Sequence, residues 1–111
     1  MIIKKPSIYI YVNNPDQAVL HEICSGIEEE GVFYEIIERD DQDIDTLTWC
    51  AANDSMLGSG IGVKDHSVAF LIRGLTMGKN ITYYAYPSQE ESRLLGTNSA
   101  RAIKKQAFKG I

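Results

Sequence analysis

The chain has 111 residues, 44% hydrophobic and 23% charged, and a formal net charge of −4. This length and composition fit one globular domain, residues 1–111, and the negative charge argues against nucleic acid as a partner. No apolar run approaches the roughly 18 residues of a membrane span, and the N-terminus lacks an apolar signal segment. We therefore expect a cytoplasmic protein without membrane contact.

The expected strands are β-branched and aromatic runs, and the expected helices repeat apolar residues at helical spacing. In chain order they are strand 7–12, helix 16–30, strand 32–37, helix 43–56, strands 59–63, 67–72 and 81–85, and helix 89–106. Gly31 and Gly58 are interpreted as the C-terminal stops of the first two helices. Ser88 and Glu91 have the spacing of a capping box at the start of the last helix.

This order predicts an α/β fold with helices on both faces of a mixed, mostly parallel five-stranded sheet. The short connection at 64–66 makes a hairpin, which forces one antiparallel strand. The residues expected in the sheet core or packed on it are Ile8, Ile10, Val12, Ile61, Val63, Phe70 and Ile81, with Leu20, Ile23, Ile27, Leu47, Leu95 and Ile103 from the helices.

No motif in the sequence predicts catalysis. Gly60 and Gly62 follow a helix and enter a strand, so they do not form a phosphate-binding loop and are expected to let a neighbouring element approach closely. His21 and His66 have no accompanying nucleophile and orienting acid. Cys24 and Cys50 are interpreted as small buried hydrophobic residues. The pattern favours a binding or interaction module over an enzyme.

The end of the first helix is the most informative segment. Three acids, Glu28, Glu29 and Glu30, stand where the negative end of the helix dipole disfavours carboxylates. They are either a solvated acidic turn or groups presented to a cation or a basic partner. His21, Glu22 and Ser25 lie on the same helix, away from its apolar stripe.

Three segments resemble the small (beta) subunit of the reactivating factor for coenzyme-B12-dependent glycerol and diol dehydratases. Residues 20–32 form a similar helix that ends in acids followed by Gly-Val. Residues 55–62 are similar to the family's Ser-Pro-Leu-x-Val-Gly-Ile-Gly, with Met56 and Ser59 in place of proline and valine. Residues 95–104 are similar to its closing Gly-x-Asn-x-Ala-x-x-x-Val-Lys helix.

The resemblance implies a three-layer α/β/α domain, similar to anticodon-binding domains, in a chaperone-like complex that expels damaged cobalamin from inactivated dehydratase. This subunit would be non-catalytic and would bind no cofactor alone. ATP or ADP would be bound by its partner, an ATPase large subunit, and the dehydratase would be an indirect partner. The complex would work in the cytoplasm, with a bacterial microcompartment as an alternative location.

The resemblance also assigns a metal ligand: Glu29 falls where the family's glutamate reaches a magnesium ion held mainly by the large subunit. The partner interface implied around it comprises His21, Glu22, Ser25, Glu28, Glu29 and Glu30. Two alternatives stay open, namely a stand-alone homo-oligomeric interaction domain of the same fold and a small-molecule-binding α/β domain.

Overall fold

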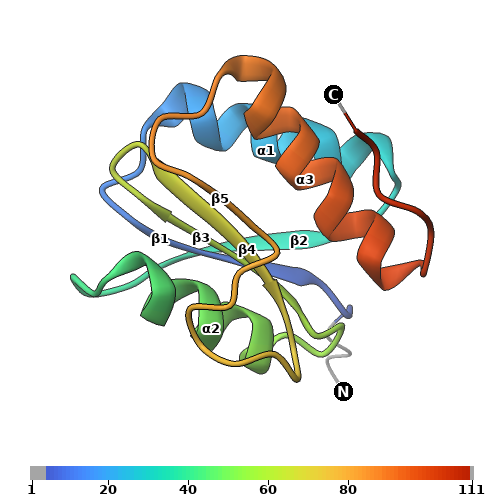
Figure 1. Ribbon diagram of the computed structural model, residues 1–111, viewed down its shortest axis with the longest axis horizontal. Helices are drawn as coiled ribbons and strands as arrows, with labels where there is room; N and C mark the ends of the chain where they lie inside the picture. Colours follow the sequence, from blue (N-terminus) through green and yellow to red (C-terminus); the bar gives the residue numbers. More distant parts are fainter. Residues whose placement is uncertain (1–4, 111) are drawn as a thin grey trace.

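The computed structural model describes residues 5–110 and has three layers (Figure 1). Helices α1 and α3 cover one face of a five-stranded sheet, and α2 covers the other face. The elements are β1 (Ile8–Asn13), α1 (Gln17–Glu29), β2 (Tyr34–Glu38), α2 (Ile44–Asp54), β3 (Ser59–Lys64), β4 (Ser67–Ile72), β5 (Thr82–Tyr84) and α3 (Gln89–Ile103). The predicted order of strands and helices is confirmed.

The sheet has the strand order β2-β1-β3-β4-β5. Strand β1 pairs in parallel with both β2 and β3, whereas β4 is antiparallel to β3 and to β5. A two-residue turn at Asp65 and His66, with φ of +54° at Asp65, reverses the chain between β3 and β4. Strand β4 is therefore the one strand that runs against the other four, as the hairpin spacing predicts.

The main core lies between the sheet and the α1–α3 layer. Ile8, Ile10 and Ile61 from the strands and Ile23 and Ile27 from α1 have no exposed surface. The predicted core is confirmed except at two positions, Ile81 and Ile103, which are half-buried against it. The core on the other face of the sheet is smaller. There, Leu47 and Ala51 of α2 pack against Tyr11 of β1.

The start of α3 agrees with the prediction, whereas the end of α2 does not. The predicted capping box is confirmed, because the Ser88 hydroxyl accepts from the Glu91 amide at 3.0 Å and the Glu91 carboxylate accepts from the Ser88 amide at 2.9 Å. The prediction that Gly58 caps α2 is wrong. Helix α2 stops at Asp54, and Ser55 leaves the helix to donate its hydroxyl to the Ser7 carbonyl at 2.7 Å.

The last helix also stops earlier than predicted, at Ile103. The chain then turns at Lys105, where φ is +56°, and runs back along α3. The Asn98 side chain holds this segment by hydrogen bonds of 2.8 and 3.1 Å to the backbone of Lys109. Among the described residues, no helix combines the length and the apolar character that crossing a membrane requires.

Candidate functional site

The candidate site is built on α1. The Asp16 side chain caps its first turn by accepting from the Val19 amide at 3.0 Å, and Gly31, with φ of +73°, ends it in the left-handed conformation. Its last turn contains no basic residue. The acidic C-terminal end that the sequence predicts is therefore present, and the question is what each carboxylate contacts.

The three glutamates have different surroundings. Glu28 is exposed and accepts a hydrogen bond from the Tyr34 hydroxyl at 2.6 Å. The Glu29 side chain is 60% exposed, with one ion pair of 3.4 Å to Arg93. Glu30 is only 14% exposed and pairs with Lys104 at 2.9 Å and Arg101 at 3.4 Å. Only Glu28 and Glu29 thus present carboxylates to solvent.

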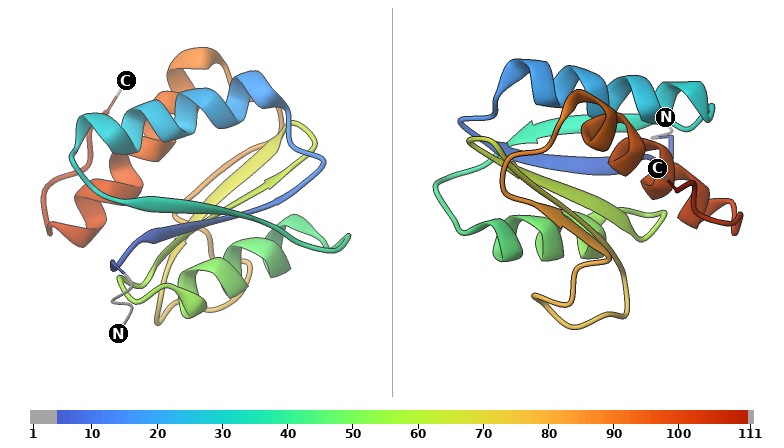
Figure 2. Two further views of the ribbon diagram at one scale, coloured as in Figure 1. Left: turned by 180° about the vertical axis from the view of Figure 1, so that it is seen from behind. Right: turned by 45° about the horizontal axis from the view of Figure 1, so that its top comes forward.

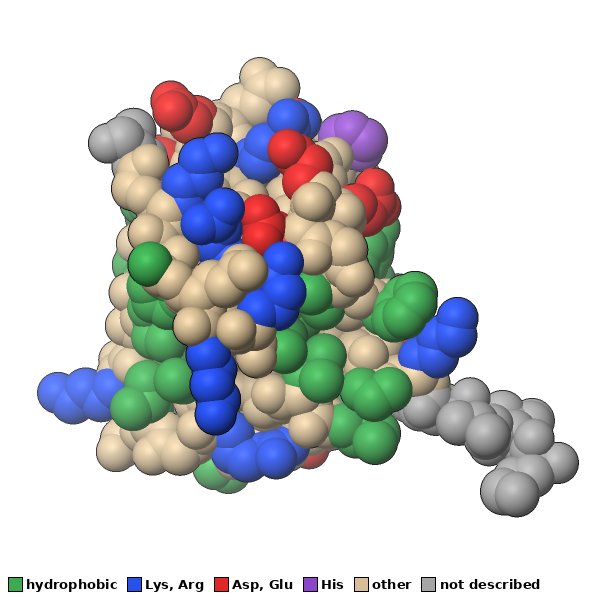
Figure 3. Space-filling model, turned by 90° about the vertical axis from the view of Figure 1, so that its right-hand side faces the viewer, with side chains coloured by type: hydrophobic (Ala, Val, Ile, Leu, Met, Phe, Trp, Pro, Cys, Tyr) green, Lys and Arg blue, Asp and Glu red, His purple; other side chains and the backbone are tan. Residues whose placement is uncertain are grey.

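Cations from α3 offset the unfavourable helix dipole at Glu30. The hydrogen bond from Lys104, with the charge of Arg101, holds the pKa of the Glu30 carboxyl below its ordinary value, against the effect of desolvation. The Lys104 ammonium also donates to the Glu30 main-chain carbonyl at 2.9 Å, so it satisfies a helix-end acceptor directly. Figure 3 shows lysine and arginine side chains gathered on this side of the molecule.

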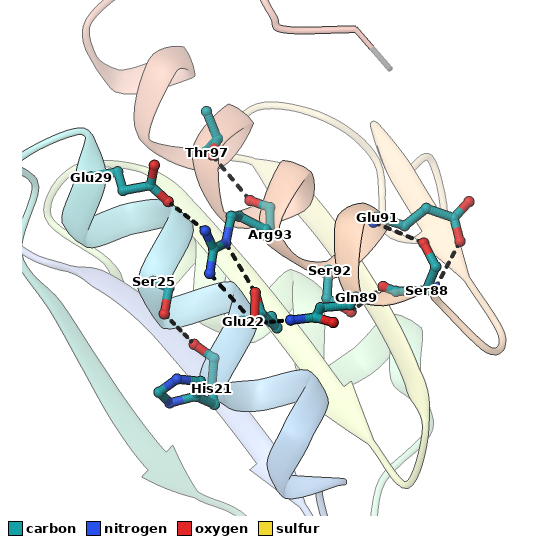
Figure 4. Close-up of polar contacts among 10 residues, drawn as sticks. All are labelled: His21, Glu22, Ser25, Glu29, Ser88, Gln89, Glu91, Ser92, Arg93 and Thr97. Atoms are coloured by element: carbon teal, nitrogen blue, oxygen red, sulfur yellow. Dashed lines mark hydrogen bonds and ion pairs between the residues drawn. The ribbon is translucent and has the colours of Figure 1, made fainter.

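A second network joins α1 to α3 through Glu22 (Figure 4). The buried Glu22 carboxylate accepts from the Gln89 amide and from the Arg93 guanidinium, each at 2.9 Å. These two contacts lower the pKa of Glu22, with the Gln89 hydrogen bond as the larger cause. Arg93 therefore links a buried carboxylate, Glu22, to an exposed one, Glu29.

The helices approach closely enough for this network because each has a glycine at the crossing. A Cβ on Gly26 would lie 2.2 Å from the Arg93 carbonyl oxygen, and a Cβ on Gly96 would lie 2.1 Å from the Ile23 carbonyl oxygen. Any side chain at either position would force the helices apart. No local sequence pattern indicates that these glycines, or Arg93 and Gln89, contact α1 or α3 in this way.

The six predicted interface residues divide into two groups. His21 and Glu28 are exposed, Ser25 is half-buried, and these three lie with Glu29 on the outer side of α1. The Ser25 hydroxyl donates to the His21 carbonyl at 3.0 Å. Glu22 and Glu30 are instead only 10% and 14% exposed, because their carboxylates are covered by the α3 segment. Of the six predicted residues, those on the outer surface of α1 are therefore His21, Ser25, Glu28 and Glu29, called the α1 outer face below.

The described residues contain no group of three or more histidine, cysteine, aspartate or glutamate side chains arranged to hold a metal. Magnesium takes oxygen ligands in a near-octahedral shell, commonly with one or two carboxylates from a protein. Glu29 is exposed and has one weak ion pair within the described residues, so it could serve as one such ligand in a shell completed by other molecules.

A groove of about 620 Å³ lies where α1 and α3 begin, and it brings His21 and His66 to one cavity. His66 is exposed, as predicted, and its Nε2 lies 3.2 Å from an Asp16 carboxylate oxygen. The Ser92 hydroxyl in this groove donates to the Ser88 carbonyl at 2.9 Å. The groove thus pairs a histidine with an acid, and its serine is engaged within α3.

The cysteine prediction is confirmed at Cys24, which is buried, whereas Cys50 is only half-buried. Burial raises the pKa of the Cys24 thiol. A raised pKa keeps the thiol protonated and unreactive near neutral pH.

The lowered pKa values of Glu22 and Glu30 predict loss of stability in acid. A carboxyl with a lowered folded pKa stabilises the protein fully above its unfolded pKa, near 4.5, and this stabilisation disappears as the pH falls through the folded value. We expect the free energy of unfolding to decrease from about pH 5 to pH 3, and to decrease less in Glu22→Gln. Urea titrations of both proteins at several pH values test this, and parallel pH profiles would contradict it.

Comparison with known proteins identifies the family. Residues 5–109 match the family described as dehydratase medium subunit. The propanediol dehydratase-reactivating factor small subunit of Salmonella typhimurium is 31% identical over 107 residues, which cover 96% of this chain and 92% of that protein. The diol dehydratase-reactivating factor small subunit of Klebsiella michiganensis is 26% identical, over 96% of this chain and 86% of that protein.

Solved structures agree with the sequence matches. A chain in the structure of diol dehydratase-reactivating factor complexed with ADP and Mg²⁺ superposes with a TM-score of 0.89 at 25% identity, covering 96% of this chain and 100% of that one. A chain of glycerol dehydratase reactivase, at 24% identity, shows the same fold with a TM-score of 0.89. The predicted resemblance and the predicted α/β fold are both confirmed. The chain belongs to the dehydratase medium subunit family, together with the small subunits of dehydratase-reactivating factors.

Proposed function

We propose that this chain is the small subunit of a reactivating factor that frees inactivated coenzyme-B12-dependent glycerol or diol dehydratase of damaged cobalamin. The observation that carries the proposal is the match to reactivating-factor small subunits over 96% of the chain. Its work is to bind a large ATPase subunit, which holds ATP or ADP, and the dehydratase is reached indirectly. This work takes place in the cytoplasm, with a bacterial microcompartment as the alternative location.

The α1 outer face supports a role in binding rather than catalysis. Its groups are one imidazole, one hydroxyl that is already donated to the His21 carbonyl, and two carboxylates. Such a set offers charge and hydrogen bonds to a partner but contains no nucleophile paired with a base. The subunit is accordingly non-catalytic in this proposal, and ATP turnover by the purified chain alone would contradict it.

Glu29 is the proposed contact to magnesium, and Glu28 supports it electrostatically. When bound, the ion would supply a shared positive charge between carboxylates of the two subunits. Within this chain, the Arg93 guanidinium lies 3.4 Å from the Glu29 carboxylate, and an exposed ion pair of this kind is weak enough to be exchanged for a metal ion. The structure of a reactivating factor with ADP and Mg²⁺ supports the presence of such an ion in related complexes.

The test is a calorimetric titration of Glu29→Gln against the reactivating-factor large subunit of the same organism, with magnesium and with a chelator. We expect the variant to bind at least about tenfold more weakly than wild type in magnesium, since even residues that only support metal ligands cost 10–100-fold. With chelator, the two proteins should bind more alike. Stability should change little, because an exposed ion pair contributes about 0–1 kcal/mol and the substitution also relieves dipole repulsion.

Glu90→Gln provides the matched control, because it removes the same charge from an exposed glutamate in the first turn of α3. It should bind like wild type in both buffers. Equal affinity of wild type and Glu29→Gln in both buffers would overturn the role of Glu29. Absence of binding by wild type would overturn the proposed partner.

A further inference from the structure

The outer edge of β2 is open in the described part of the chain. The Ile8 amide donates to the Phe33 carbonyl and the Arg39 amide to the Val12 carbonyl, both at 2.9 Å. In a parallel pair alternate residues face the neighbouring strand, so the odd-numbered residues of β2 pair with β1. The amides and carbonyls of Tyr34, Ile36 and Glu38 therefore point away from the sheet, and no other described segment pairs with them.

This edge has one of the usual protections against pairing, the charges of Glu35 and Glu38, but lacks the others. Edge strands are commonly shortened, bent by a bulge, interrupted by proline, given lysines or covered by another element. Strand β2 contains neither proline nor lysine, and its register with β1 is continuous from Tyr34 to Glu38. Figure 2 shows α1 and α2 above and below the sheet, with β2 running along its uncovered side. The opposite edge strand, β5, is protected by being only three residues long.

A groove of about 270 Å³ follows this edge between α1 and β2. Leu20 and Cys24 from α1 and Tyr34 and Ile36 from β2 line it. Ile36 is 46% exposed, so its apolar side chain in the groove is accessible to a partner. An added strand would bring alternate side chains over this groove, where an apolar residue would be buried.

The charges around the groove specify the added strand. Glu28 lines it, and Glu38 lies on the same face of β2 as Tyr34 and Ile36 by strand alternation. A second copy of this chain, paired antiparallel about Ile36, would place its Glu38 opposite Tyr34, whose hydroxyl already contacts Glu28. Two carboxylates would then meet at each end of the pair, which disfavours self-association and favours a basic strand.

We propose that β2 accepts an extended segment of the large subunit as a sixth strand, with an apolar side chain in the α1–β2 groove and a basic side chain near Glu28 and Glu38. The inference rests on the proposed function and deepens it. The groove is lined by His21, Ser25 and Glu28 of the α1 outer face, so strand addition and the Glu29 contact would belong to one continuous interface.

The test compares Ile36→Pro with Ile36→Val in binding to the same large subunit. Proline removes the outward amide of Ile36 but none of the hydrogen bonds to β1, and proline is tolerated in edge strands at such positions. We expect Ile36→Pro to bind about tenfold more weakly, because one acceptor of the added strand is left unpaired in a buried interface. Ile36→Val retains the amide and the branched side chain and should bind like wild type.

Hydrogen exchange supplies a readout that needs no variant. On complex formation the amides of Tyr34, Ile36 and Glu38 should exchange at least about tenfold more slowly. The amides of Glu35 and Ile37 are already protected by β1, so their exchange should change little. Unchanged exchange at the three outward amides in a complex that forms normally would overturn strand addition and leave the proposed function intact. Dimerisation of the free chain through β2 in sedimentation experiments would assign the edge to a second copy and also overturn it.

Discussion

Replacing Ile23 by alanine should lower the free energy of unfolding by about 2–5 kcal/mol. Ile23 is fully buried in the core between the sheet and the α1–α3 layer. Its main chain already lies against α3 at Gly96, where the two helix backbones are in close contact. The helices therefore cannot move closer together to fill the space that the substitution opens. Both the lost burial and the residual cavity therefore destabilise the protein.

Urea unfolding at 25 °C measures this effect as a shift in midpoint at constant slope. Ile36→Ala is the matched control, because it deletes the same atoms from a side chain that is 46% exposed. Its cost should stay within about 0.5 kcal/mol. A similarly small loss in Ile23→Ala would show that the apolar stripe of α1 does not form the core.

The fold could be predicted from the sequence because its determinants are local. Strand β4 matches its predicted range, residues 67–72, since the short polar turn before it and the run of apolar residues define both of its ends. Boundaries failed where a long-range contact decides them. Helix α2 ends early because Ser55 donates to Ser7, a residue 48 positions away, and no local pattern indicates that bond.

The candidate site could be predicted only in part for the same reason. The acids at the end of α1 are visible in the sequence because their position conflicts with the helix dipole. Their contacts are not visible, because Arg93 lies 71 residues from Glu22 and Lys104 lies 74 residues from Glu30. The crossing at Gly26 and Gly96 that brings these groups together is a tertiary feature, and an isolated glycine within a helix does not indicate which helix it contacts.

One prediction from the glycine pattern is confirmed by the packing of α2 on β3. A Cβ on Gly60 would lie 2.0 Å from the Ala52 amide nitrogen and 2.4 Å from the Ala51 carbonyl carbon. A Cβ on Gly62 would lie 2.3 Å from the Thr48 hydroxyl oxygen. The alternating glycines therefore form a flat strip on which α2 rests.

Gly60→Ala should consequently destabilise the protein by about 3 kcal/mol, the upper end of the usual cost of overpacking. The atoms that the new methyl group would meet belong to the α2 backbone, so no side-chain rotation can relieve the contact and the whole helix must move. Gly62→Ala should cost less, because the Thr48 hydroxyl it meets first belongs to a side chain. Urea unfolding of both variants measures the difference, with Gly110→Ala, where a Cβ would meet nothing within 4 Å, as the control for adding a methyl group. Equal, small losses in Gly60→Ala and Gly110→Ala would mean that α2 can move away from β3 at little cost, and that the glycines do not determine how closely the two elements pack.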